Sequence, residues 1–300
     1  MKVLNFGSCN VDYVYSMSHI VREGETIPAQ NLELFAGGKG LNQSIAAARA
    51  GVSTYHAGCI GYDGQMLRDI LTQSGVDLSY LREVDEKNGH AIIQVDEQGN
   101  NCIVIYAGSN HCVTRGQIDG VLEQFSSNDI ILLQNEINDV EYVIEKAHEK
   151  GMCVVFNPSP IDAVISRIDF DKISYVILNE IEAEGITGRA DTDGQLDFFC
   201  KNYPDLKVIL TLGKNGAIMM YDGRLLREAA LDVCVVDTTA AGDTFTGYFV
   251  AGLAAGDDYG LILRRASVAA AIAVSRAGAA PSIPTEAEVL DAMDELRPIK

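Results

Sequence analysis

The chain has 300 residues, of which 47% are hydrophobic and 22% are charged, as expected for a single globular domain spanning residues 1–300. Its 42 acidic and 23 basic side chains give a formal net charge of −19, which argues against broad binding to nucleic acid or to anionic membranes. No apolar run approaches the roughly 20 residues of a membrane-spanning helix, and the chain starts without a secretory pattern. The 7 cysteines are scattered without a CxxC pair, so we expect buried thiols, no zinc site and a cytoplasmic location.

The first elements predict a strand followed by polar side chains. Residues 2–6 form a short apolar run that indicates a buried strand. Asn10 and Asp12 alternate with apolar neighbours, so both side chains point to one side of an extended segment. A solvent-facing strand edge explains this pattern equally simply, and the pattern alone does not establish a site.

A glycine-rich loop at residues 36–40 leads into a helix predicted over residues 44–50, with Gly51 just beyond its end. The loop fits neither the Walker A spacing nor G-x-G-x-x-G, so neither kind of nucleotide fingerprint is present. Glycine permits close approach of a ligand to the backbone. Lys39 and Asn42 at the helix start favour such contact over a turn that serves packing alone.

Residues 53–60 and 65–74 predict a strand and a helix, and a hairpin signal follows. Two β-rich runs, residues 89–95 and 101–107, flank a polar turn and have no helix between them. Residues 24–35 lack helical periodicity. We therefore expect this hairpin, together with residues of about 13–35, to form a small second sheet outside the main layer.

From residue 114 onward, helical and strand patterns alternate, which predicts an α/β fold with a mostly parallel central sheet flanked by helices on both faces. The expected strands are 130–134, 152–157, 175–178 and 208–211, with a hairpin at 217–221 and 224–226. The expected helices are 117–125, 139–150, 180–185, 192–202, 244–255, 261–277 and 285–296. Polar residues end five strands, at Asn10, 134–136, Asn157, 179–180 and 211–213, which favours a ligand site on that rim.

The prediction of function depends on residues 233–247. The β-branched run 233–236 predicts a strand, and a tight turn and a helix follow it. Ala240, Ala241 and Gly242 carry almost no side chain, so the free amides of the helix start can approach an anion such as phosphate. Asp243 would then lie beside that anion, where a base accepts a hydroxyl proton. An aspartate that only complements the helix dipole fits this stretch about as well.

Taken together, these residues resemble the ribokinase family of sugar kinases, the PfkB group, over essentially the whole chain. Two motifs carry the resemblance, Gly-Gly-Lys-Gly-Leu-Asn-Gln at residues 37–43 and Asp-Thr-Thr-Ala-Ala-Gly-Asp-Thr-Phe at 237–245. Residues 10–12 and 276–282 most resemble the ribose kinases of the group. The resemblance implies a ribokinase-like fold with a β-sheet lid, and transfer of the ATP γ-phosphoryl group to the 5-hydroxyl of ribose, with Mg²⁺ and K⁺ as cofactors.

The resemblance also implies a role for individual residues. Asp243 is the expected catalytic base, and Ala240, Ala241 and Gly242 are the expected anion hole. The expected sugar ligands are Asn10, Asp12, Gly38, Lys39, Asn42, Glu136 and Asp243. The expected nucleotide contacts are Asn179, Thr211, Gly213, Gly216, Gly242 and Ser267. The expected potassium site contains Asp237, Thr239, Ala273, Arg276, Gly278 and Ser282.

Departures from the family pattern leave alternatives open. Ser267 stands where the family often has Asn, which leaves the adenine contact open. Tyr13, Tyr15 and Tyr106 lie in or near the expected lid and could alter the sugar pocket. The substrate could therefore be 2-deoxyribose, fructose, another sugar or a nucleoside. A non-catalytic sugar-binding protein is a further alternative, against which the intact Asp243 and glycine turn argue. We also expect a homodimer through the lid sheet.

Overall fold

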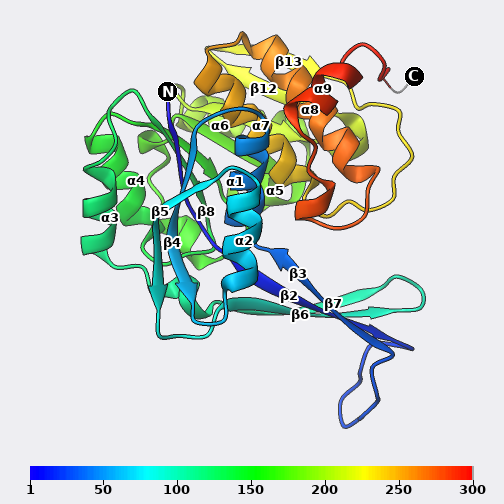
Figure 1. Cartoon of the computed structure of the whole chain (residues 1–300). Helices are drawn as coiled ribbons and strands as arrows, with labels where there is room; N and C mark the ends of the chain where they lie inside the picture. Colours follow the sequence, from blue (N-terminus) through cyan, green and yellow to red (C-terminus); the bar gives the residue numbers. More distant parts are fainter. Residues whose placement is uncertain (299–300) are drawn as a thin grey trace.

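The computed structural model describes residues 1–298 as an α/β body from which a smaller sheet projects (Figure 1). The main sheet has nine strands, and every neighbouring pair from β11 to β5 is parallel, while β12 and β13 form an antiparallel edge. Its order is β13 (Arg224–Glu228), β12 (Ala217–Tyr221), β11 (Lys207–Thr211), β10 (Tyr175–Asn179), β9 (Cys153–Asn157), β8 (Ile130–Gln134), β1 (Val3–Phe6), β4 (Thr54–Gly61) and β5 (Asp77–Val84). The predicted mostly parallel sheet is confirmed.

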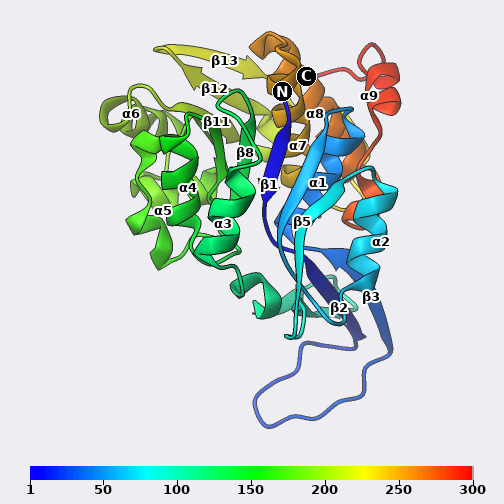
Figure 2. The same ribbon diagram turned by 60° about the vertical axis from the view of Figure 1, so that its left-hand side comes forward.

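Two helix layers cover this sheet (Figure 2). One layer contains α1 (Lys39–Arg49), α2 (Gln65–Gln73), α7 (Ala241–Ala255), α8 (Tyr259–Val274) and α9 (Glu286–Ala292). The other contains α3 (Arg115–Leu122), α4 (Val140–Glu149), α5 (Glu180–Thr187) and α6 (Thr192–Asn202). Alternate strand residues enter the two cores, so Ile130 and Leu132 pack on the α1 side and Ile131 and Leu133 on the α3 side. Burial on both faces explains why the strand sequences are continuously apolar.

The smaller sheet has the order β3 (Asn31–Gly37), β2 (Asn10–Met17), β6 (Gly89–Asp96) and β7 (Asn101–Tyr106). β6 and β7 are antiparallel, as the hairpin signal predicts, and β2 joins the two hairpins by pairing parallel to β6. Large apolar side chains are exposed on this sheet, including Leu34, Ile103 and Ile105. Asn10 and Asp12, expected to follow the first strand of the main sheet, thus lie in β2 of the smaller sheet.

Three expectations about secondary structure are wrong at particular places. Residues 233–236 are not a strand, because no described strand pairs with them, and Val236 N instead bonds to Val274 O of α8 at 2.8 Å. The sequence reading missed β5, an edge strand whose polar residues interrupt the apolar pattern. The last helix ends at Ala292 rather than 296, although its Thr285–Glu288 capping box is present.

The cysteines also differ from expectation. All seven lie within residues 1–298 and are free thiols, but Cys102, Cys200 and Cys234 are exposed, so only part of the set is buried. Among the described helices, none is both long enough and apolar enough to cross a lipid bilayer.

Candidate active site

The amino end of α7 presents unpaired backbone amides. Its N-cap, Ala240, has φ 59° and offers no side-chain cap. Ala241 N bonds weakly back to Thr238 O at 3.3 Å, and the amides of Gly242 and Asp243 have no acceptor among the described residues. A Cβ built on Gly242 would meet no atom within 4 Å. The helix start therefore faces open space, as an anion site requires.

Two adjoining cavities lie at this helix start and share Asn179, Thr211, Thr238 and Gly242. The polar cavity, of about 210 Å³, is also lined by Lys39, Asn157, Ile177, Leu178, Glu182, Ala240, Asp243 and Thr246. The apolar cavity, of about 570 Å³, is also lined by Glu180, Ile181, Gly213, Lys214, Gly216, Ala217, Ala230, Leu231, Val233, Val235, Ala241, Phe245, Ser267, Ala270, Ala271 and Val274. The strand ends at Asn157, Asn179 and Thr211 thus share one rim, as predicted.

Asp243 lies in the first turn of α7 with only 8% of its surface exposed. Its carboxylate accepts two side-chain hydrogen bonds from α1. Asn42 Nδ2 donates to Oδ2 at 3.0 Å, and Gln43 Nε2 donates to Oδ1 at 2.9 Å. Neither donor is a cation, so the acid is oriented by amides rather than neutralised in an ion pair.

Charged side chains gather around Asp243. Burial acts to lower the pKa of the Lys39 ammonium, but the nearby carboxylates of Asp243 and Glu136 outweigh it and raise that pKa above its usual value. Glu136 accepts hydrogen bonds from Ser8 Oγ and from Lys39 N, the latter at 2.9 Å. Burial still raises the pKa of Glu136. Burial, and then repulsion from Glu136, raise the pKa of Asp12 to about 7.

Asn10 and the glycine-rich loop meet at the base of the smaller sheet. Asn10 Oδ1 accepts from Asn110 Nδ2 at 2.7 Å. A Cβ on Gly37 would lie 2.1 Å from Asp12 Oδ2, so only glycine leaves room for that carboxylate. Gly38 has φ +93°, a conformation that favours glycine. Asn10, Asp12 and Gly38 are therefore neighbours, with Asn10 N 3.0 Å from the Cβ position of Gly38.

The predicted nucleotide residues are brought together, because all six line the apolar cavity. Gly216 has φ +91°, and a Cβ there would be 2.0 Å from Glu228 O, so its glycine serves the packing of the β12–β13 edge. Ser267 reaches the cavity from α8. The run 233–236, expected as a strand, instead contributes Val233 and Val235 to the cavity wall.

The predicted potassium residues are only partly joined by contacts. Asp237 Oδ2 accepts from Gly278 N at 2.9 Å, and its Oδ1 accepts from the amide and hydroxyl of Thr239 at 2.9 and 2.7 Å. Ser282 bonds to Ala279 O, and the carbonyl of Ala273 accepts from Arg276 N at 3.1 Å. The Arg276 guanidinium turns away to Glu288 at 2.7 Å. Residues 1–298 contain no cluster of three or more His, Cys, Asp or Glu side chains suited to a metal.

Sequence reasoning missed several residues of the site. Gln43, Glu182 and Thr246 line or support the polar cavity, and none of them was given a role. The signal for Glu182 was present, because Asn179 and Glu182 form the capping box that starts α5. Gln43 closes the glycine-rich motif 37–43, but its contact was not predicted, since a glutamine inside an alanine-rich helix ordinarily faces solvent.

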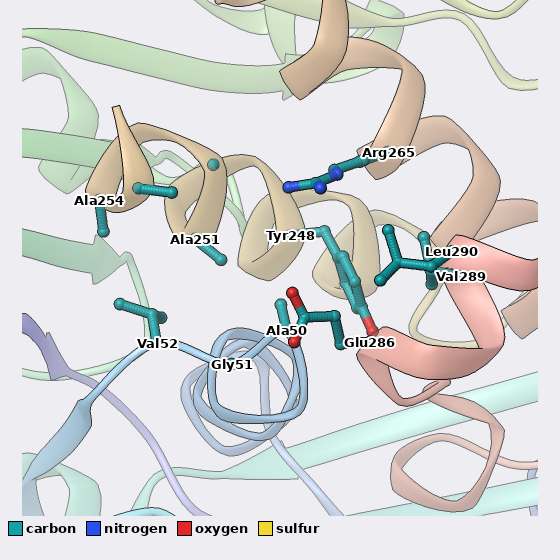
Figure 3. A pocket seen from close by; sticks show the side chains of 12 residues that line it. Ala50, Gly51, Val52, Tyr248, Ala251, Ala254, Arg265, Glu286, Val289 and Leu290 are labelled. Carbon is teal, nitrogen blue, oxygen red and sulfur yellow. The ribbon is translucent and has the colours of Figure 1, made fainter. Parts of the chain in front are cut away.

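A separate hollow of about 180 Å³ lies between the end of α1 and the helices α7, α8 and α9 (Figure 3). Tyr248, Arg265 and Glu286 line it. It shares no lining residue with the polar or apolar cavity, and it contains none of the residues predicted from the sequence.

The fold and the site define a class. An acid beside the free amides of a helix start, between a polar cavity and a larger apolar one, suits transfer of a phosphoryl group between two bound molecules. Residues 1–286 match the pfkB family of carbohydrate kinases, and the chain belongs to this family. The protein is accordingly a sugar kinase.

Individual relatives agree with this assignment. The ribokinase of Haemophilus influenzae is 35% identical over 297 residues, which cover 96% of this chain and 97% of the relative. A ribokinase from Cryptococcus neoformans in complex with ADP superposes with a TM-score of 0.85 at 34% identity, covering 97% and 99% of the two chains. The ribokinase of Arabidopsis thaliana complexed with ribose and ATP gives 0.87 at 29% identity, covering 97% and 98%.

Proposed function

We propose that this kinase transfers the γ-phosphoryl group of ATP to the 5-hydroxyl of ribose, giving ribose 5-phosphate and ADP. The observation that carries the proposal is the position of Asp243 in the wall of the polar cavity, which joins the apolar cavity at Gly242. A sugar hydroxyl above Asp243 and a nucleotide in the apolar cavity would meet at the free amides of α7. The ribokinase relatives supply the choice of ribose and ATP.

The sugar would be held by polar groups on the Asp12 side of the site. Asn42 Oδ1 is buried and has no hydrogen-bond partner among the described residues, so it can accept a sugar hydroxyl. Ionised Asp12 can accept two hydroxyls, and Asn10 and Glu136 lie beside the same loop. A site with so many fixed polar groups rejects ligands that lack the matching hydroxyls.

In the transfer step, Asp243 takes the proton of the 5-hydroxyl. The hydroxyl oxygen of the sugar forms a bond to the γ-phosphorus of ATP, while the bond between that phosphorus and the oxygen of the departing ADP breaks. The negative charge on the transferring group is offset by the amides of Gly242 and Asp243 and by the Lys39 ammonium. The raised pKa of Lys39 keeps this ammonium charged at neutral pH.

The nucleotide base and ribose would occupy the apolar cavity, with Thr211, Gly213 and Ser267 among the contacts. Mg²⁺, bound with ATP, would neutralise phosphate charge. The carboxylate of Glu182 lines the polar cavity and is an oxygen ligand of the kind that Mg²⁺ prefers. This residue would hold the ion together with the phosphate oxygens of ATP.

A potassium ion is proposed at the loop of Asp237 and Gly278. Three hydrogen bonds from the loop lower the pKa of Asp237 despite partial burial, so it stays ionised. One carboxylate together with backbone carbonyls suits a weakly hydrated monovalent cation. Such an ion would order the turn that precedes α7. Equal rates in sodium and potassium would contradict this part of the proposal.

We infer that the smaller sheet acts as a lid over the sugar and pairs with the lid of a second subunit. Its exposed apolar residues, such as Val104 and Ile105, each 60% exposed, support burial against a partner. A monomer in sedimentation velocity would contradict the dimer. We also propose a cytoplasmic location, where ATP is present and exposed thiols such as Cys102 stay reduced.

The central test is Asp243→Asn in a coupled assay for ADP release with ribose. We expect kcat to fall by about 10²–10⁴, the usual contribution of a general base. Retention of most of the activity would refute the role of Asp243 as base. Parallel assays with 2-deoxyribose, fructose and nucleosides test the substrate, and a higher kcat/KM for any of them would replace ribose.

A further inference from the structure

A chain of buried amides runs through the core to the carboxylate of Asp243. Its members are Asn5 on β1, Gln134 on β8, Gln43 on α1 and Asn157 on β9. Each is no more than 8% exposed. Burying four amides is costly unless their hydrogen bonds are made, so this arrangement calls for an explanation beyond packing.

The hydrogen bonds at the two ends of this chain fix the direction of every amide. Asn5 Nδ2 donates to Gly40 O at 2.7 Å, and Asn157 Nδ2 donates to Ile177 O at 2.8 Å. Backbone carbonyls can only accept, so the two amide oxygens must turn inward.

The inner bonds then follow in only one way. Gln134 Nε2 donates to Asn5 Oδ1 at 3.0 Å and to Gln43 Oε1 at 2.6 Å. The Gln43 amide therefore presents its two N–H groups on the other side, one to Asn157 Oδ1 at 3.0 Å and one to Asp243 Oδ1 at 2.9 Å. A flipped Gln43 would place its oxygen against the carboxylate and lose all three bonds.

The far end of the chain adds no charge that could disturb it. Asn5 Nδ2 also donates to Ser44 Oγ at 2.8 Å, and Ser44 contacts His56, which in turn lies 3.3 Å from Cys9 Sγ. Burial lowers the pKa of His56 to about 4 and raises that of Cys9 to about 12, so both stay neutral at physiological pH. The network carries a formal charge only at Asp243.

We propose that Gln43 is a positioning residue for phosphoryl transfer, which holds Oδ1 of Asp243 and leaves Oδ2, the oxygen that Asn42 reaches, to take the hydroxyl proton. This inference rests on the proposed role of Asp243. The strands β9, β8 and β1 are neighbours in the sheet and carry Asn157, Gln134 and Asn5, so three of the four amides are fixed on one rigid element. Misplacement of a reacting group by about 1 Å can cost on the order of 10²-fold in rate.

The test compares Gln43→Met with Gln117→Met. Gln117 serves as a control, because its amide donates to the backbone carbonyl of Gly58 at 2.7 Å, while the residue is half-buried, lies on α3 and lines neither cavity. We expect Gln43→Met to lower kcat by roughly 10–100-fold and to change the KM for ribose by less than about 3-fold. Gln117→Met should retain its kcat. Thermal unfolding of each variant reports whether it is folded.

A conservative variant separates positioning from a general structural role. Gln43→Glu keeps the shape of the side chain but replaces the N–H donor by an oxygen that faces Asp243 Oδ1. It should therefore lower kcat at least as far as Gln43→Met does, again with little change in the KM for ribose. If Gln43→Met does not fold, the kcat of Gln43→Glu decides.

A double-mutant cycle completes the test. If Gln43 acts through Asp243, Gln43→Met should have no further effect on kcat in an Asp243→Asn background. An equal loss in both backgrounds, or a wild-type kcat for Gln43→Met, would overturn the inference. Should Asp243→Asn itself retain activity, the proposed base role fails and this inference falls with it. If Asp243→Asn is inactive and Gln43→Met is normal, only the role of Gln43 is lost.

Discussion

The amino ends of α1 and α7 both lie at the polar cavity, but they differ in whether their first backbone amides have hydrogen-bond acceptors. At α1, the amide of Lys39 donates to Glu136 and that of Gly40 donates to Ser8 Oγ at 3.2 Å. At α7, the amides of Gly242 and Asp243 have no acceptor among the described residues. Both helices begin after a residue with positive φ and without a side-chain cap.

The glycines at these two helix starts, Gly40 and Gly242, also differ in the space around them. A Cβ on Gly40 would lie 2.3 Å from Ser8 N and 2.6 Å from Gly7 C, both backbone atoms. A Cβ on Gly242 would project into open space. Glycine at α1 thus lets the helix pack against the β1–β2 connection, while glycine at α7 borders open space. Two similar glycine turns therefore differ: one is filled by the chain itself, and the other is free for the ligand that we propose.

The sharpest test of this difference is Gly242→Ala. The added methyl group should occupy the anion site and lower kcat/KM for ATP by roughly 10–100-fold. Stability should stay equal or rise slightly, since alanine is favoured over glycine within a helix by about 0.5–1 kcal/mol. Steady-state kinetics and thermal unfolding measure the two effects. An alanine variant with wild-type kinetics would show that no ligand approaches this backbone.

The complementary change is Gly40→Ala, which should lower the free energy of unfolding. The methyl group meets backbone atoms that cannot move independently, and such overpacking costs about 1–3 kcal/mol. Urea unfolding at equilibrium measures this loss. A variant as stable as the wild type would mean that α1 can withdraw from the β1–β2 connection, and the contrast between the two helix starts would weaken.

The charges beside α1 predict that ribose binding depends on pH. Asp12 has a pKa raised to about 7, and it accepts hydroxyls best when ionised. The Kd for ribose, measured by calorimetry, should therefore rise as the pH falls through about 7. Glu136→Gln removes the repulsion that contributes to this pKa, so the transition should move to lower pH. A Kd that is constant from pH 5.5 to 8.5 would contradict the role of Asp12.

The smallest expected effect is on stability. The folded-state pKa of Asp12 exceeds that of an exposed aspartate, so the folded protein binds this proton more tightly. The resulting stability is complete below about pH 4 and is lost as the pH rises through about 7. Asparagine cannot ionise, so Asp12→Asn avoids the loss of stability that occurs when Asp12 becomes charged in the folded protein. The variant should therefore have a Tm a few degrees above that of the wild type at pH 8, but not at pH 4. Equal shifts at both pH values would point to another cause.

Much of the fold could be predicted because its signals are local. The strand at Ile130–Gln134 and the helix at Thr192–Asn202 have the bounds that their patterns predict. The edge of the sheet was harder, because β5 has an exposed, partly polar face and residues 233–236 have a strand composition without a strand partner. A β-branched run forms a strand only where a neighbouring strand is available to pair with it.

The sequence by itself determined the alternation of strands and helices, the two glycine turns and the identity of Asp243 as the candidate base. Periodicity, glycine and capping residues act over a few positions along the chain, so they can be read directly. The tertiary structure alone decided which helix start stays open, how Gln43 is oriented, and that Asp12 and Glu136 influence each other. These depend on contacts between residues that lie about 100 to 200 positions apart, such as Gln43 and Asp243, whose meeting is set by the packing of α1 on α7.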